Sequence, residues 1–139
     1  MGKLIAIVDP FPRTLELIFS KDKLKILRTK YELIYVPKNK KQFFYEKNIH
    51  KASFIIGQPN LPKNLLIKAK KLKAIINVES NFINNMDYQY CFKKGIHVIA
   101  TSPVFSKPVA EIALGMTLSL LRNIHTAHLD LLRVKKNMD

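Results

Sequence analysis

The stretch LKAIINVESNFINNMDYQYCFKKGIHVIA, residues 72–100, holds one complete strand–helix–strand unit and decides the fold class. Its first apolar run, KAIINV at 73–78, predicts a buried strand, and IHVIA at 96–100 predicts another. Continuously apolar runs of this length are typical of strands that are covered on both faces of a sheet. The stretch therefore favours an internal part of a layered fold.

A short helix is predicted between these two strands. Asn84 or Asn85 can cap its first turn with a side-chain oxygen. Gly95 suits its end, because glycine readily adopts the left-handed conformation that closes many helices. Since parallel strands need such a crossover connection, the unit predicts a parallel strand pair.

The residues before this unit repeat the same order of elements. Three further apolar runs predict strands: KLIAIV at 3–8, ELIYV at 32–36 and ASFIIG at 52–57. Helices are predicted between them, from Leu15 to Ile26 with a break near 20–22, around Phe43 and Phe44, and from Pro62 to Leu72. Strands and helices that alternate throughout predict an α/β fold, a flavodoxin-like parallel sheet of about five strands with helices on both faces.

Composition excludes some classes of partner. The chain has 139 residues and a formal net charge of +14, but 20 of its 24 basic residues are lysine, spread over several predicted elements. Nucleic-acid recognition favours the planar arginine fork, so we expect a solvated surface and no nucleic-acid partner. One cysteine, Cys91, allows no internal disulfide, and the first apolar run is too short for a signal peptide or membrane span. We therefore expect a soluble, cytoplasmic protein with no membrane partner.

The sequence lacks the motifs of several kinds of catalytic and cofactor site. The four glycines, at 2, 57, 95 and 115, never fall within six residues of one another, so neither GxGxxG nor a P-loop is present. Asp9 follows the first strand, as in receiver domains, but the third strand ends in Gly57-Gln58 without the acid that such domains need beside Mg²⁺. His125 and His128 are spaced for one helix face but lack a third metal ligand, so we expect no metal site.

The loop NVESNF at 77–82 is unusually polar for a connection after a buried strand. In parallel sheets ligands gather at the carboxyl ends of the strands, where this loop should lie. Its successive backbone N–H groups can bind an anion such as a carboxylate. The alternative is that its Ser and Asn side chains satisfy their own backbone, and the composition does not decide between the two.

Residues from Leu72 to about Arg133 resemble the D-isomer-specific 2-hydroxyacid dehydrogenases. The matching features, in order, are the strand LKAI, the polar loop, an Asn-x-Asp turn at 85–87, KGIHV at 94–98 and PVAE at 108–111 opening a long helix. The resemblance implies that residues 1–105 are a flavodoxin-like substrate domain, 106–134 a long helix that crosses to a Rossmann domain, and 135–139 a tail. It also implies a 2-hydroxy or 2-oxo acid as substrate and NAD or NADP as cofactor of the full-length enzymes.

Two site assignments follow from the resemblance. Glu79, Ser80 and Asn81 match the loop whose backbone amides hold the substrate carboxylate, although relatives usually have glycine there and this loop is one residue longer. Ser106 matches a position beside the nicotinamide, and its alternative role is the N-cap of the long helix. The family's cofactor loop and catalytic residues have no counterpart here, so we assign no catalytic residue and expect no cofactor to bind this chain alone.

The segment SKPVAEIALGMTLSLLRNI at 106–124 is apolar nearly all round a helix. Such a helix must be buried on more than one side, so we expect exposed leucines unless something docks there. We predict an N-terminal fragment of a dehydrogenase that is inactive by itself and needs a nucleotide-binding domain or companion chain. The alternative is an independent interaction module that uses this helix to dimerise or to bind a partner.

Overall fold

The structure is a computed structural model that describes residues 2–79 and 81–136. It divides into two compact units, the first reaching Ser102 and the second starting at Pro103. Each unit is described by itself.

The first unit contains the five expected strands and five helices, with one 3₁₀ turn. The strands are β1 (Leu4–Asp9), β2 (Tyr31–Tyr35), β3 (Phe54–Gly57), β4 (Ala74–Ile76) and β5 (His97–Ile99). The helices are α1 (Leu15–Ile18), α2 (Lys21–Lys30), α3 (Lys41–Asn48), α4 (Lys63–Lys68) and α5 (Tyr88–Lys93), with the 3₁₀ turn η1 at Ile49–Lys51.

All strand pairs are parallel, and the sheet order is β2-β1-β3-β4-β5. This is the flavodoxin-like order, in which the chain reverses direction across the sheet between β1 and β3. The predicted fold class is confirmed, because the order, the crossover helices and the long C-terminal helical region are all present.

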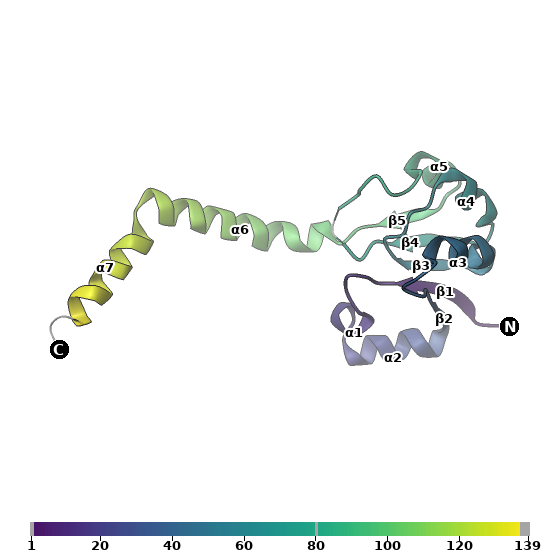
Figure 1. Cartoon of the computed structure of the whole chain (residues 1–139), viewed down its shortest axis with the longest axis horizontal. Helices are drawn as coiled ribbons and strands as arrows, with labels where there is room; N and C mark the ends of the chain where they lie inside the picture. Colours follow the sequence, from purple (N-terminus) through teal and green to yellow (C-terminus); the bar gives the residue numbers. More distant parts are fainter. Residues whose placement is uncertain (1, 80, 137–139) are drawn as a thin grey trace. The chain divides into compact units, whose positions relative to one another are not determined.

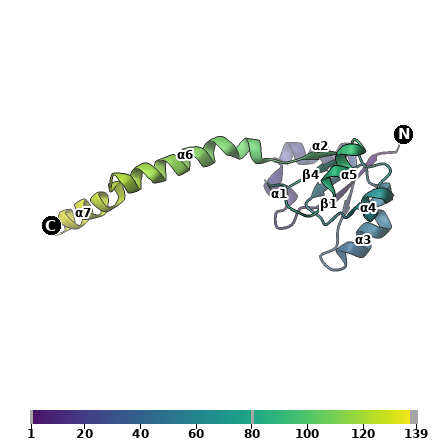
Figure 2. The same ribbon diagram turned by 90° about the horizontal axis from the view of Figure 1, so that it is seen from above.

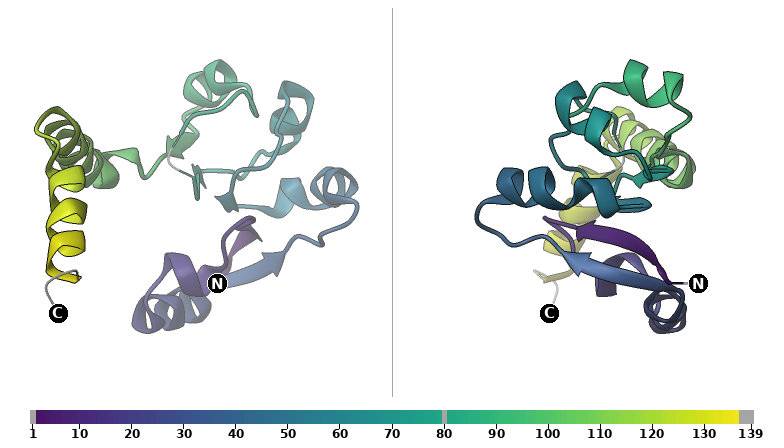
Figure 3. Two further views of the ribbon diagram at one scale, coloured as in Figure 1. Left: turned by 60° about the vertical axis from the view of Figure 1, so that its left-hand side comes forward. Right: turned by 90° about the vertical axis from the view of Figure 1, so that its right-hand side faces the viewer.

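Helices α1 and α2 lie on one side of the sheet, and α3, α4 and α5 lie on the other (Figures 1 and 3). Seen from above, α4 and α5 lie over the strands (Figure 2). Alternate strand residues point to opposite faces, so Ile7 and Ile75 join the core beneath α3–α5, whereas Val8 and Ile56 join the core beneath α1 and α2. Continuous apolar strands are therefore required by a sheet with two covered faces.

Two helix boundaries differ from the sequence-based expectations. The prediction that Asn84 or Asn85 caps α5 is wrong, because the N-cap is Asp87, whose Oδ1 accepts a hydrogen bond from the Tyr90 N–H at 2.8 Å. Asn85 is buried instead, and its Nδ2 donates to the Pro59 carbonyl at 2.8 Å. Helix α4 ends at Lys68 and does not reach Leu72.

The second unit consists of two helices where one continuous helix over 106–134 was expected. Helix α6 spans Ser102–Leu121 and α7 spans Ile124–Lys136, separated by Asn123 in a left-handed conformation with φ 51°. No side chain of α6 is buried, and α6 is long and apolar enough to cross a membrane by length and composition. The leucines and isoleucine expected to be exposed are so: Leu120, Leu121, Ile124, Leu129 and Leu131.

Candidate functional site at the carboxyl ends of the strands

The carboxyl ends of β1 and β3 meet where the strand order reverses. Asp9, the last residue of β1, is paired in register with Gly57, the last residue of β3. A side chain at Gly57 is excluded, since an added Cβ would lie 2.2 Å from the Asp9 carbonyl oxygen and the backbone has φ 151°. Flavodoxin-like folds bind ligands in a crevice at this point, outside the carboxyl ends of the strands on either side of the reversal.

Asp9 is the buried charged group of this crevice. It is 6% exposed, and its Oδ1 accepts a hydrogen bond from the ammonium of Lys41 at 2.6 Å. Lys41 is the first residue of α3 and is partly exposed, so the pair lies at the boundary between core and solvent. A buried carboxylate needs such a partner, because an uncompensated charge in the interior is costly.

Tyr45, one turn further along α3, brings a second polar group under the same crevice. The residue is 1% exposed, and its hydroxyl has no hydrogen-bond partner among the described residues. Burial raises the pKa of the Tyr45 hydroxyl well above its ordinary value, and the negative charge of Asp9 raises it further. Tyr45 is therefore a neutral donor at physiological pH and cannot act as a base there.

The polar loop after β4 is held to the ends of both β1 and β3. The Arg13 Nε, in the turn after β1, donates to Glu79 Oε1 at 3.1 Å. The Gln58 Nε2, just after β3, donates to the Asn81 carbonyl at 2.8 Å. These two contacts fix the loop from both sides.

The loop's own donors remain unused within the described structure. No described residue accepts a hydrogen bond from the backbone N–H of Val78, Glu79, Asn81 or Phe82. Successive free amides in a turn form a concave anion site. This observation favours anion binding over the alternative in which the loop satisfies its own backbone.

Asn77, between β4 and this loop, is fully buried. Both its Oδ1 and its Nδ2 lack a hydrogen-bond partner among the described residues, although its backbone N–H donates to the Ile99 carbonyl at 2.8 Å. The Oε1 of Gln58 is also buried without a described partner. Buried polar atoms are nearly always paired, so these atoms call for water or a bound ligand.

Two cavities share the Asp9–Lys41 pair in their linings. One of about 380 Å³ is lined by the turn after β1 and the entry to α3, including Phe11, Arg13 and Lys38. The other, of about 290 Å³, is lined by Gln42, Tyr45, Gln58, Pro59 and Asn60 as well as by the pair itself. The first is within the size range of small-molecule sites and is lined by three basic side chains, so it suits an anionic ligand.

The predicted site residues fall in three places. Glu79 and Asn81 lie in the loop, where the side chain of Glu79 is occupied by Arg13. Ser80 lies outside the described residues. Ser106 is inside α6, and its Oγ donates to the Pro103 carbonyl at 3.0 Å, so the alternative role of N-cap is wrong because the helix begins at Ser102.

Sequence reasoning missed Lys41, Tyr45 and Asn77 as parts of the site. Asn77 was included in the polar loop but not singled out, and a polar residue ending an otherwise apolar strand is the signal that marks it. Lys41 was one lysine among 20, and only the fold brings it to Asp9. Tyr45 follows Phe43 and Phe44, and the aromatic run predicts only an apolar helix face, with no polar role for the hydroxyl.

Other reactive groups of the first unit are not set up for catalysis. Burial raises the pKa of the Cys91 thiol, so the thiol is inert as a nucleophile. Among the residues that the structure describes, no three metal-ligating side chains come together.

Comparison with known proteins gives a consistent result. The sequence model of one family, described as D-isomer specific 2-hydroxyacid dehydrogenase, catalytic domain, matches residues 6–133. Proteins of Staphylococcus aureus that carry the name 2-hydroxyacid dehydrogenase are 30% identical over 80 residues, which is 56% of this chain and 25% of theirs.

Solved structures agree with the sequence match. A phosphoglycerate oxidoreductase from Rhizobium etli is 43% identical, with a TM-score of 0.71, covering 88% of this chain and 38% of that one. An NAD⁺-bound 3-phosphoglycerate dehydrogenase from Entamoeba histolytica has the same fold at 21% identity, with a TM-score of 0.61, covering 85% and 39%. The chain thus spans about a quarter of the curated relatives and under two-fifths of these structures.

Proposed function

The chain belongs to the D-isomer specific 2-hydroxyacid dehydrogenase family, and from that premise we propose that it is the substrate-binding part of an NAD(P)-dependent oxidoreductase acting on 2-hydroxy acids. The observation that carries the proposal is the loop after β4. Its free backbone amides are held in place by Arg13 and Gln58 at the carboxyl edge of the sheet. A substrate carboxylate would accept hydrogen bonds from these amides.

The role of each neighbouring group follows from its position. Gln58 fixes the loop through the Asn81 carbonyl, and its Oε1 is buried without a described partner. Asn77 is fully buried beside the loop, so its amide, unpartnered among the described residues, would act on the substrate through an ordered water. Lys41, with Asp9 behind it, would orient an anionic or polar tail of the acid in the adjoining cavity.

The residues of this chain do not fit a dinucleotide. A pyrophosphate needs backbone N–H donors at a glycine-rich turn before a helix, but the turn between β1 and α1 contains Pro10 and Pro12, which have no N–H. Gly57 packs against the Asp9 carbonyl and leaves no room for a phosphate. We therefore derive no hydride-transfer step here, and we propose that the chain by itself is catalytically inactive and completed by a nucleotide-binding domain or a companion chain.

The apolar surface of α6 fits the same proposal. Glu111 lies in the middle of the helix, 3.9 Å from Lys107, and a charge at such a depth is costly within a bilayer. We propose that protein, not lipid, covers α6, and that the molecule is cytoplasmic. The alternative, an independent module that dimerises through α6 and α7, is favoured by the large exposed side chains of both helices.

The test of substrate binding is a titration of the ¹⁵N-labelled chain with pyruvate, followed by the amide signals of the loop. Saturable shifts at Val78, Glu79, Asn81 and Phe82 are expected, whereas methyl pyruvate, which lacks the charge, should cause much smaller ones. Gln58→Met should weaken pyruvate binding about tenfold by releasing the loop. Gln89→Met, the same change at an exposed position on α5, is the control.

Shifts that are equal for pyruvate and its ester would contradict the carboxylate site. A parallel titration with NADH tests the second half of the proposal. We expect that NADH does not bind and that 2-oxo acids are not turned over, and tight NADH binding would refute an incomplete enzyme. Sedimentation separates the two readings of α6, because a dimerisation module predicts one discrete dimer.

A further inference from the structure

A third cavity lies at the opposite end of the sheet from the substrate loop. Its volume is about 400 Å³, and it is lined by residues of α4 and α5, by residues that follow these helices and by the residues that precede β4 and β5: Leu66, Ile67, Ala69, Lys70, Leu72, Tyr90, Lys94 and Ile96. Leu72 and Ile96 come just before their strands, so the cavity opens at the amino ends of β4 and β5. It therefore cannot be an extension of the site at the carboxyl ends.

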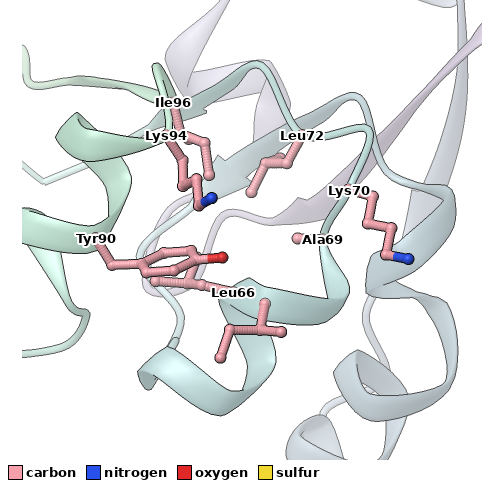
Figure 4. A pocket seen from close by; sticks show the side chains of 8 residues that line it. Leu66, Ala69, Lys70, Leu72, Tyr90, Lys94 and Ile96 are labelled. Carbon is pink, nitrogen blue, oxygen red and sulfur yellow. The ribbon is translucent and has the colours of Figure 1, made fainter.

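Two polar groups are directed into this cavity. Figure 4 shows the ammonium of Lys94 and the hydroxyl of Tyr90 pointing into the same space, while the ammonium of Lys70 points away at the rim. The Lys94 Nζ lies 6.0 Å from the centre of the Tyr90 ring. Within residues 2–79 and 81–136, neither group has a hydrogen-bond or ion-pair partner, so both remain available to a ligand.

The surrounding charge selects an anion. Residues 60–78 contain five lysines and residues 88–98 contain two, and neither segment contains an aspartate or glutamate. The field of these lysines attracts negative ligands and repels cations. Because only one ammonium and one hydroxyl are directed into the cavity, the donors match a carboxylate better than a doubly charged phosphate.

Apolar core residues form part of the cavity wall, beside the polar groups. Leu66, Leu72 and Ile96 are buried residues of the core under α4 and α5, and their side chains surround the two polar groups (Figure 4). An organic acid can place its apolar body against this part of the wall, a contact that a fully hydrated inorganic anion does not make.

We propose that this cavity is a second ligand site, which binds a small organic acid with its carboxylate on Lys94 and Tyr90 and its apolar body against Leu66, Leu72 and Ile96. The site is independent of the substrate loop. It is formed by α4 and α5, which connect β3 to β4 and β4 to β5, so an occupant would contact Leu72, which lies just before β4, the strand that Asn77 follows.

The experiment uses benzoate as the probe, with the full ¹⁵N-labelled chain. Saturable amide shifts are expected at Ala69, Lys70, Tyr90 and Ile96, and not at the loop 78–82. Benzyl alcohol, which has the same ring without the charge, should bind at least about tenfold more weakly, because the charge-assisted hydrogen bond is lost.

Matched variants make the assignment specific. Lys94→Gln should weaken benzoate binding about tenfold, whereas Lys93→Gln, which removes the same charge one residue away without lining the cavity, should change it less than twofold. Tyr90→Phe removes only the hydroxyl and should weaken binding about threefold. An unchanged pattern of amide signals in each variant shows that the fold is kept.

Three outcomes would overturn the proposal. The first is the absence of saturable shifts around the cavity. The second is equal weakening by Lys94→Gln and Lys93→Gln, which would indicate only a general charge effect. The third is benzoate binding confined to the loop 78–82, which would assign the probe to the substrate site.

Discussion

The sheet unit and the helical unit use apolar side chains in opposite ways. Helix α2 contains six charged residues among ten, yet it buries Leu24 against the sheet. Helix α6 contains only two charged residues among its 20, Lys107 and Glu111, yet no residue of α6 is buried. Apolar content therefore does not decide burial, which depends on whether a complementary face is present.

The difference indicates where the stability of this chain resides. The sheet unit has two cores, one on each face, and each buried side chain contributes roughly 25 cal/mol per Å² of apolar surface removed from water. The second unit gains nothing comparable from its own residues. Its stability should depend on a partner, and changes in the two units should have very different effects.

The largest contrast is expected from shortening one apolar side chain in each unit. Ile75→Ala removes a fully buried side chain from the core beneath α3–α5 and should lower the free energy of unfolding by about 2–5 kcal/mol. Leu120→Ala, at a residue that is 75% exposed, should change it by less than about 0.5 kcal/mol. Urea unfolding followed by tyrosine fluorescence measures both, and a comparable loss from the two variants would show that α6 is part of the folded core.

Replacing one glycine in each unit by alanine tests the same difference between the sheet unit and the helical unit. Gly57→Ala should cost about 3 kcal/mol, because its Cβ would meet the Asp9 carbonyl oxygen at 2.2 Å and its φ of 151° disfavours a side chain. Gly115→Ala, where nothing lies within 4 Å, should raise the helicity of α6 and leave the unfolding of the sheet unit unchanged. Circular dichroism combined with urea titration separates these effects, and a tolerated Gly57→Ala would argue against the close approach of β1 and β3.

The sheet was predictable because each of its strands is marked by a local run of apolar residues. Runs such as LIAIV at 4–8 are continuously apolar, and each predicted strand is bounded by a proline, a glycine or a polar loop. The order of the elements along the chain and the parallel direction of the strands therefore follow from the sequence. Helix ends were harder, since Asn84, Asn85 and Asp87 are all good caps. Asp87 takes this role because Asn85 is drawn into the core by its bond to the Pro59 carbonyl.

The candidate site was only partly predictable for a different reason. Glu79 and Asn81 share one loop, and a local pattern together with the family resemblance identifies them. The partners that hold this loop, Arg13 and Gln58, come from the ends of two other strands, 66 and 23 residues away in the sequence. Only the sheet order brings them together, so no reading of spacing along the chain could identify them.

A smaller effect is expected from pH, and it belongs to the sheet unit alone. The pKa of Tyr45 is raised by burial and by Asp9, so above pH 10, the ordinary tyrosine value, the folded state binds more protons than the unfolded state. The stabilising contribution is complete below pH 10 and is lost as the pH rises above it, by about 1.4 kcal/mol per pH unit. Tyr45→Phe should remove this dependence, which unfolding measured between pH 9 and 11 in both proteins would reveal, and identical slopes would contradict it.

The smallest expected effect comes from the contact between Arg13 and Glu79. Both side chains are substantially exposed, so Arg13→Gln should change the free energy of unfolding by less than about 1 kcal/mol. The consequence should instead appear in the loop, because removing one of its two attachments leaves the amides at 78, 79 and 81 more mobile. Amide order parameters should fall there and stay unchanged in α6. Arg28→Gln, which breaks a similarly exposed pair with Glu16 far from the loop, is the control. If both variants leave the loop equally rigid, Gln58 alone fixes the substrate loop, and the stabilising role assigned to Arg13 is wrong.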